Sequence, residues 1–235
     1  MARLLLKLSG EALGGEAGYG LSSEVLARMS LDIGRLVDSG AEVALVLGGG
    51  NLFRGQALAQ AGMDRVVGDR MGMLATVMNG LAMGDFLTQA GVPNQLYSSV
   101  GIAGVARGYH RDSALEDMVD GKVVILSGGT GNPFFTTDTA ACLRGVELGV
   151  DAVLKATNVD GVYDADPKQN PNARKFKAIT YDQVLALGLG VMDLTAIVLC
   201  KENSMPLVVF DMNQADALVD LAQGRDVGTQ IVSEV

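Results

Sequence analysis

The sequence predicts an α/β fold built around a mostly parallel sheet, and three observations lead to this prediction. First, 49% of the 235 residues are hydrophobic and 19% are charged, which supplies the core of one domain or of two tightly joined ones. Second, short apolar runs without polar alternation recur along the chain, as is typical of strands covered by helices on both faces. Third, helical patterns separate these runs, and strand alternating with helix favours a parallel sheet.

The predicted strands and helices follow one another along the chain. Strands are expected at residues 3–8, 42–47, 122–126, 151–154 and 207–210. Helices are expected at residues 22–39, 69–89, 138–148, 181–187, 195–203 and 214–221. The helix at 22–39 has the clearest pattern, because Val25, Met29, Ile33 and Leu36 form one apolar stripe and charged residues fill the opposite side.

The helix at 69–89 differs from the others because it is apolar nearly all round. It carries Met71, Met73, Met78 and Met83. Such a helix belongs either in the core beside a large sheet or at an interface between subunits, since methionine-rich apolar faces suit association. The pattern leaves both interpretations open.

Composition excludes several classes of function. The net charge of −9 argues against a general nucleic-acid binder. With one histidine, His110, and two cysteines, Cys142 and Cys200, the chain lacks the residues for a structural zinc site, a disulfide scaffold or a histidine-based triad. We expect His110 at the surface and both cysteines to be packing residues. The acidic segment 160–166 does not fit a calcium loop, because Ala165 and Pro171 stand where glycine and glutamate are required.

The sequence predicts neither a signal peptide nor a membrane span. Lys7 interrupts the short apolar stretch at the N-terminus. The longest uncharged stretch, 86–106, contains several polar residues and glycines, which do not suit a bilayer. We therefore expect a cytoplasmic protein without a membrane partner.

Three glycine-rich segments each follow a predicted strand, at 9–20, 48–50 and 128–131. Any one of them alone could be a turn. Ligands of open α/β sheets bind beyond the carboxyl ends of the strands, where glycine lets backbone N–H groups approach phosphate oxygens. Together the three segments favour a phosphate-rich ligand, although neither the Walker pattern nor the dinucleotide pattern is present.

Two lysines and one aspartate could serve that ligand. Lys7 and Lys155 each end an apolar strand, where a lysine either reaches solvent or meets an anion, and we favour the anion. Asp138 begins a predicted helix. It is either a capping carboxylate or a group that orients the two lysines, and the residues leave this choice open.

Five segments carry a resemblance to a known family. They are KLSGEAL at 7–13, GGGNLFRG at 48–55, DRMGMLATVMNGLAM at 69–83, GTGNPFFTTDTAACLR at 129–144 and LKATNVDGVYDADP at 154–167. In this order they resemble the bacterial UMP kinases of the amino acid kinase family, over essentially the whole chain. The resemblance implies a three-layer αβα sandwich in one domain, 1–235, whose N-terminal part mainly serves UMP and whose C-terminal part mainly serves ATP.

The resemblance also implies an activity: transfer of phosphate from MgATP to UMP, giving UDP and ADP in pyrimidine nucleotide synthesis. This chemistry suits the composition. A phosphate monoester has a second pKa of about 6, so the acceptor is largely a dianion that needs no general base. Mg²⁺ would be held mainly by nucleotide phosphates, and we predict no dedicated metal ligands.

The family pattern assigns site residues in two groups around a catalytic set. The lysines would stabilise the transferring phosphoryl group and the carboxylate would fix them, which makes the catalytic set Lys7, Asp138 and Lys155. The ATP side would comprise Lys7, Leu8, Ser9, Gly10, Gly50, Arg54, Thr157, Asn158, Tyr163 and Asp166. The UMP side would comprise Gly49, Asp69, Thr130, Gly131, Asn132, Pro133, Phe134, Phe135, Thr136 and Thr137.

The resemblance further implies a homohexamer, inhibition by UTP and, in many members, activation by GTP. The segment that aligns with an effector-linked loop is Gly15, Glu16, Ala17, Gly18, Tyr19 and Gly20. Where some relatives carry basic residues, this chain has Gly84, Thr88 and Gln95, which weakens the case for GTP.

Other functions stay open on the residues alone. A phosphotransferase of the same family acting on a carboxylate or carbamate would use the same lysines. A nucleotide-binding protein without activity would be expected to lack a reactive lysine, and the missing dinucleotide motif argues against an oxidoreductase.

Overall fold

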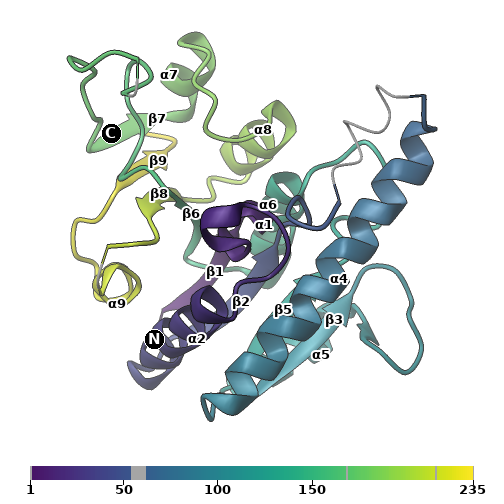
Figure 1. The fold of residues 1–235 in the computed structure, drawn as a ribbon. Coiled ribbons are helices and arrows are strands. Elements are labelled where there is room, and N and C mark those ends of the chain that lie inside the picture. The colour runs from purple at the N-terminus through teal and green to yellow at the C-terminus, as the bar shows by residue number, and fades with distance from the viewer. Residues whose placement is uncertain (1, 54–61, 168, 215, 235) are drawn as a thin grey trace.

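The computed structural model describes residues 2–53, 62–167, 169–214 and 216–234 (Figure 1). The strands in this part of the chain are β1 Arg3–Leu8, β2 Glu42–Leu47, β3 Asn94–Ser98, β4 Arg107–Gly108, β5 Val123–Ser127, β6 Ala152–Thr157, β7 Ala178–Thr180, β8 Leu207–Asp211 and β9 Thr229–Val232. They form one sheet in the order β4-β3-β5-β2-β1-β6-β8-β9-β7. Neighbouring strands are parallel except for β8 and β9, which are antiparallel.

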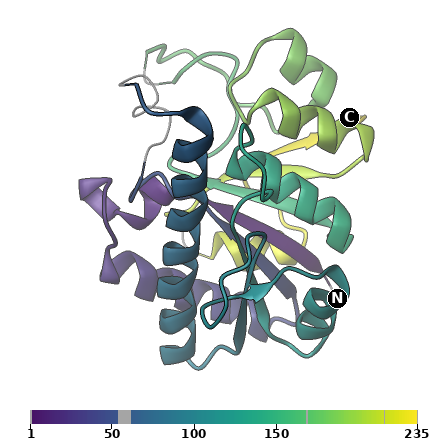
Figure 2. The same ribbon diagram turned by 90° about the vertical axis from the view of Figure 1, so that its right-hand side faces the viewer.

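Helices cover both faces of this sheet. They are α1 Gly10–Leu13, α2 Ser23–Asp38, α4 Arg65–Gln89, α5 Arg111–Val119, α6 Thr137–Leu148, α7 Tyr181–Ala186, α8 Leu194–Glu202 and α9 Ala217–Ala222, with a short 3₁₀ turn η1 at Gly15–Ala17. Figure 2 shows the purple α2 and blue α4 on one side of the sheet and the teal α6 and green α8 on the other.

The core divides into two apolar layers because side chains alternate along each strand. On β1, Leu4, Leu6 and Leu8 pack with α2, α4 and α9, whereas Leu5 packs with α5, α6, α7 and α8 on the other face. The strands β1, β2, β5 and β8 are therefore covered on both sides, which explains their continuous apolar sequences. The predicted three-layer αβα arrangement with a mostly parallel sheet is confirmed.

The two strands β1 and β2 match the predicted ranges to the residue. The helix predicted at 69–89 starts one turn earlier, at Arg65, because Asp64 caps it by accepting from the Val67 N–H group. Several elements were not predicted. They are β3, β4, β7, β9, α1, η1 and α5, which are short or lack a clear apolar period.

Helix α4 is buried on one face only (Figure 1). Met73 and Met83 lie in the interior, whereas five apolar side chains stay exposed. These five form the α4 stripe: Val67, Met71, Leu74, Met78 and Leu81. One face of α4 thus packs in the core beside the sheet, and its exposed apolar face keeps the interpretation as a subunit interface open.

Candidate active site

Two lysines and one carboxylate meet at the carboxyl ends of the central strands. Lys7 on β1 and Lys155 on β6 are directly paired in the parallel register, so both side chains leave the sheet on the same face. Helix α6 covers that face and brings Asp138 between them. One carboxylate oxygen of Asp138 lies 2.5 Å from the Lys7 Nζ and the other lies 2.7 Å from the Lys155 Nζ. The structure thus favours the orienting role of Asp138 over simple capping, since the cap of α6 is Thr136.

The three groups are largely removed from solvent, with side-chain exposures of 8% for Lys7, 13% for Asp138 and 16% for Lys155. Burial alone would raise the pKa of Asp138 above its ordinary 3.8, but the charges of Lys7 and Lys155 outweigh burial and lower it. Two ammonium groups sharing one carboxylate leave a surplus of one positive charge. A buried surplus of this kind favours an incoming anion.

Burial acts in the opposite way on the second lysine. It lowers the pKa of Lys155 from its ordinary 10.5; Asp138 opposes this effect and the charge of Lys7 adds to it. The Nζ of Lys155 also donates to the backbone carbonyl of Val191. The amine is therefore held by two acceptors from different segments.

Asp193, two residues after Val191, braces the same region, and it was not among the predicted site residues. Its carboxylate accepts from the hydroxyls of Thr136 and Thr139 at the start of α6, and it caps α8 through the Ala196 N–H group at 3.0 Å. An aspartate just before a helical pattern could have been read as a cap. Its contact with α6 joins segments 54 residues apart and has no signal in the sequence.

The first two glycine segments pack so closely against each other at Gly10 and Gly48 that no side chain fits there. A Cβ on Gly10 would lie 2.6 Å from the backbone nitrogen of Gly50, and a Cβ on Gly49 would lie 2.9 Å from the Gly72 carbonyl oxygen on α4. Ser9 caps α1 by accepting from the Ala12 N–H group at 3.2 Å. The backbone of both segments is thereby placed beside Lys7, as a phosphate cradle requires.

A buried pair of amides, Asn51 and Asn79, holds these loops and was also not predicted. The two side chains donate to each other, at 2.7 and 3.2 Å. Asn79 on α4 also donates to the carbonyl of Gly48, and Asn51 donates to the carbonyl of Gly20, both at 2.6 Å. The Gly20 N–H group in turn donates to the Asn51 carbonyl at 2.9 Å. The pair joins the predicted effector loop 15–20 to the loop at 48–50.

A cavity of about 130 Å³ opens beside this cradle, between α4 and the loop before α6. The predicted UMP-side residues that line it are Gly49, Asp69, Thr130, Asn132, Phe135, Thr136 and Thr137. Gly50, predicted for the ATP side, lines it too. Gly131, Pro133 and Phe134 belong to the same loop but not to the lining. Lining residues that were not predicted include Gly72, Met73 and Thr76, which follow Asp69 on one face of α4 and could have been found from helical spacing.

A second cavity of about 440 Å³ lies on the other side of the cluster. The predicted ATP-side residues that line it are Thr157, Tyr163 and Asp166, and the predicted catalytic residue Lys155 lines it too. Segment 188–191 completes the lining and was not predicted. Asn158 is exposed and lies outside the lining. Lys155 lines this cavity, and Asp138 directly follows Thr137 of the first one, so the charged cluster connects the two.

Leu8 and Arg54 were also predicted for the ATP side. The side chain of Leu8 is fully buried and faces the α2 layer, so only its backbone is directed to the strand end. Arg54 lies outside the described residues.

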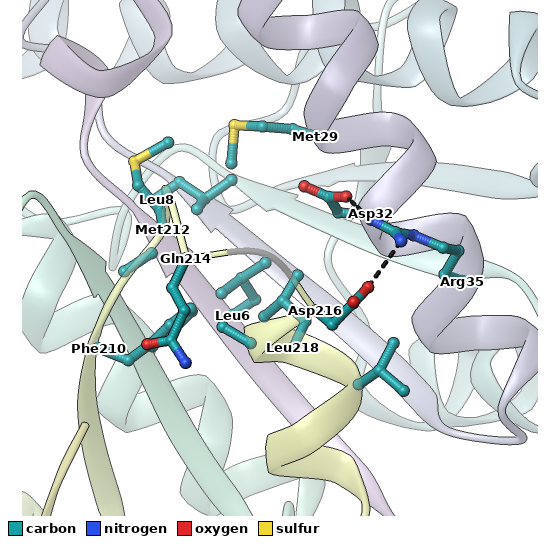
Figure 3. A pocket seen from close by; sticks show the side chains of 13 residues that line it. Leu6, Leu8, Met29, Asp32, Arg35, Phe210, Met212, Gln214, Asp216 and Leu218 are labelled. Carbon is teal, nitrogen blue, oxygen red and sulfur yellow. Dashed lines mark hydrogen bonds and ion pairs between the residues drawn. The ribbon is translucent and has the colours of Figure 1, made fainter. Parts of the chain in front are cut away.

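A third cavity lies under α2 and α9 and is far smaller, about 20 Å³ (Figure 3). Leu6, Leu8 and Phe210 line it with other apolar side chains, and Arg35 closes one side by pairing with Asp32 at 2.5 Å and Asp216 at 2.7 Å. A space of this size holds about one water molecule. It is a packing defect at the helix contact.

The remaining predictions concern single residues. His110 is exposed at the start of α5, and Cys142 and Cys200 are free and buried. In the 160–166 segment, Asp160 pairs with Tyr163 at 2.7 Å and with Lys175 at 3.0 Å. Within the described ranges, no cluster of three histidine, cysteine or acidic side chains is placed to hold a metal ion, and no helix is long and apolar enough to span a membrane.

Comparison with known proteins agrees with this geometry. The sequence pattern of the amino acid kinase family matches residues 2–211. The uridylate kinases of Alcanivorax borkumensis and Pseudomonas aeruginosa are each 58% identical over 229 residues, which is 97% of this chain and 91% and 94% of theirs.

Solved structures agree as well. The UMP kinase from Bacillus anthracis superimposes with a TM-score of 0.96 at 36% identity, covering 99% of this chain and 96% of that chain. The UMP kinase from Ureaplasma parvum gives a TM-score of 0.92 at 34% identity, covering 99% of both chains. This chain therefore belongs to the amino acid kinase family and, within it, to the uridylate kinases.

Proposed function

We propose that the protein transfers the γ-phosphoryl group of MgATP to UMP, giving UDP and ADP. The observation that carries this proposal is the cluster of Lys7, Asp138 and Lys155 between two cavities, in a chain that shares 58% identity with uridylate kinases. UMP occupies the cavity beside α4, and the nucleoside part of ATP occupies the cavity beside Tyr163. The phosphates of both meet at the lysines.

Charge is the main obstacle to this reaction, because the monophosphate of UMP must approach the triphosphate of ATP and both are anions. The acceptor phosphate has a second pKa of about 6 and is already a nucleophile at neutral pH, so the site needs no general base. Lys7 and Lys155 stabilise the charge on the phosphoryl group in flight, and Asp138 fixes the two amines. The backbone N–H groups of the glycine loops bind the remaining phosphate oxygens.

Mg²⁺ fits this arrangement as a partner of the nucleotide. When bound, it neutralises charge on the phosphates of ATP. Magnesium keeps water and phosphate oxygens as ligands, so a site without a dedicated cluster of acidic ligands suits it.

The first experiment measures UDP formation from UMP and MgATP. CMP, aspartate, glutamate and carbamate are tested in parallel as acceptors, because a carboxylate or carbamate phosphotransferase would use the same lysines. Phosphorylation of UMP alone, or of UMP far faster than of the other acceptors, supports the proposal. Binding of ATP and UMP without UDP would refute it.

The second experiment replaces the amines. Lys7→Met and Lys155→Met should each lower turnover about 100- to 1000-fold, as expected for loss of one preorganised charge donor. Lys177→Met is the control, since Lys177 is an exposed lysine paired with Asp226 away from the cluster. Thermal melting checks that all three variants fold. Near-normal turnover in both active-site variants would overturn the assignment.

We further propose that the protein works in the cytoplasm, in pyrimidine nucleotide synthesis, as a homohexamer built from dimers. The α4 stripe supports self-association: its residues 67, 71, 74, 78 and 81 repeat at intervals of four and three, the spacing of a helix-pairing seam. Two copies of α4 packed along this seam would form the dimer.

Regulation by the end product is part of the same proposal. UTP inhibits and GTP is the candidate activator, acting through loop 15–20. The hydrogen bonds between Gly20 and Asn51 support a link from this loop to the phosphate cradle. Adding UTP or GTP to the UDP assay tests both effects.

A further inference from the structure

The loop 128–136 lies over the cavity proposed for UMP, the acceptor cavity. Its start is bound to α4 because the Gly128 N–H group donates to the Thr76 hydroxyl at 2.8 Å, and its middle is bound to α4 by the carboxylate of Asp69. The backbone N–H group of Phe134, in the middle of the loop, donates to the Oδ2 of Asp69 at 2.7 Å. The ends of the loop have other anchors: Ser99 donates to the Gly129 carbonyl at 2.8 Å, and Thr136 donates to Asp193. Asp69 therefore determines where the middle of the loop lies.

Arg65 in turn holds Asp69. Its Nε donates to both carboxylate oxygens, at 2.8 Å to Oδ1 and 2.9 Å to Oδ2. The two residues are one helical turn apart on α4, which places their side chains together. The same guanidinium lies 5.7 Å from the centre of the Phe134 ring, within range of a cation–π contact.

Phe134 needs such support. Its φ of +72° lies in the left-handed region, which disfavours a residue with a bulky side chain, and its ring is 68% exposed. A strained residue with an exposed ring stays in place only when neighbouring groups hold it. Arg65 provides this from both sides, because it contacts the ring and orients the carboxylate that binds the backbone.

The bonds to Asp69 leave room for a ligand. A carboxylate has about four acceptor positions on its two oxygens. Arg65 and Phe134 use both positions of Oδ2 and one of Oδ1. The remaining position on Oδ1 can accept a hydroxyl from a molecule in the cavity, which Asp69 lines.

We propose that Arg65 is a positioning residue for the acceptor nucleotide. It fixes the Asp69 carboxylate so that one oxygen accepts from a sugar hydroxyl while the other keeps the loop closed. This inference rests on the proposed function, since it concerns the same acceptor cavity. It predicts an effect on UMP binding and none on ATP.

The test uses Arg65→Ala in the UDP assay. We expect the KM for UMP to rise about tenfold, in line with the loss of a charge-assisted hydrogen bond at a partly exposed site, while kcat and the KM for ATP change less than twofold. Arg70→Ala is the matched control, because Arg70 is an exposed arginine on the same helix. It removes the same charge from α4 and should leave the KM for UMP unchanged.

A double-mutant cycle with Asp69→Asn separates positioning from direct contact. If Arg65 acts through Asp69, then Arg65→Ala should change the KM for UMP less than twofold when Asp69 is already replaced. A full tenfold effect in that background would mean that Arg65 contacts the substrate itself and would overturn the proposal. Equal effects of Arg65→Ala and Arg70→Ala, or equal rises in both KM values, would also overturn it. Failure of the proposed function looks different, because the unaltered protein would then form no UDP.

Discussion

The side chains of Lys7, Asp138 and Lys155 form a buried cluster of three charges. A buried ion pair needs excellent geometry to offset the cost of removing charges from water. In this cluster one carboxylate pairs with two amines, so one of the two positive charges is not neutralised. Burial, with the charge of Lys7 adding to it, lowers the pKa of Lys155 and makes its protonation sensitive to alkaline pH.

A pH profile checks this at the residue scale. Because the pKa of Lys155 is lowered from 10.5, its amine loses its charge as pH rises through a value below 10.5. As this charge is lost, we expect kcat/KM for ATP to fall, which gives the pH profile a descending alkaline limb. In Lys155→Arg, whose guanidinium keeps its proton, the limb should move to higher pH. An unchanged limb in this variant would show that another group causes the fall.

Helix α4 links more parts of the site than any other element described. Its first turns carry Arg65 and Asp69 toward the acceptor loop, its middle lies against Gly49, and Asn79 holds the Gly48 carbonyl. A single helix therefore sets both the acceptor cavity and the phosphate cradle. Loss of the hydrogen bonds of Asn79 should therefore lower the free energy of unfolding.

The substitution Asn79→Leu tests whether the amide contacts of α4 stabilise the fold. The substitution keeps the branched shape and the number of heavy atoms of the side chain, but it leaves the Gly48 carbonyl and the Asn51 side chain buried without their partner. Each unsatisfied group costs about 1–3 kcal/mol, so we expect the free energy of unfolding to fall by about 2–4 kcal/mol in urea denaturation. Asn203→Leu, at an exposed helix end, is the control and should cost about 0.5 kcal/mol or less. Equal losses in the two variants would contradict a special role for the amide pair.

The sequence predicts those elements whose buried faces give a regular pattern of apolar residues. The strands that hold Lys7 and Lys155 were predicted, because both their faces are apolar, and alternation puts the two lysines on one face. Asn79 and Asp193 were not, because each acts on a segment far along the chain and no local pattern marks such a contact. Strand β9 was missed for a similar reason: its antiparallel pairing with β8 depends on tertiary packing and not on its own four residues.

At the scale of the whole molecule, the α4 stripe gathers five exposed apolar side chains along one helix, which is typical of an interaction surface. A seam of side chains spaced by four and three residues is stable in water when it is covered. The same helix that shapes the acceptor cavity would then lie at the subunit contact. Assembly and substrate binding would share one element.

Charges placed on the stripe should separate the subunits. We expect the double substitution Leu74→Glu with Met78→Glu to lower the mass measured by sedimentation equilibrium, because four carboxylates would face one another across a two-fold contact. Leu31→Glu, at an exposed leucine on α2, should leave the mass unchanged. A protein that sediments as a monomer before any substitution would rule out this role for α4.

The direct pairing of Lys7 with Lys155 across two hydrogen-bonded strands has a consequence for heat inactivation. The backbone ladder sets the interval between the two residues, and Asp138 holds their amines, so this arrangement should persist while the sheet and α6 stay folded. Turnover at saturating nucleotide should persist until the sheet melts cooperatively, whereas the loop pinned by Asp69 can detach earlier. Warming would then first raise the KM for UMP and would lower kcat only at a higher temperature.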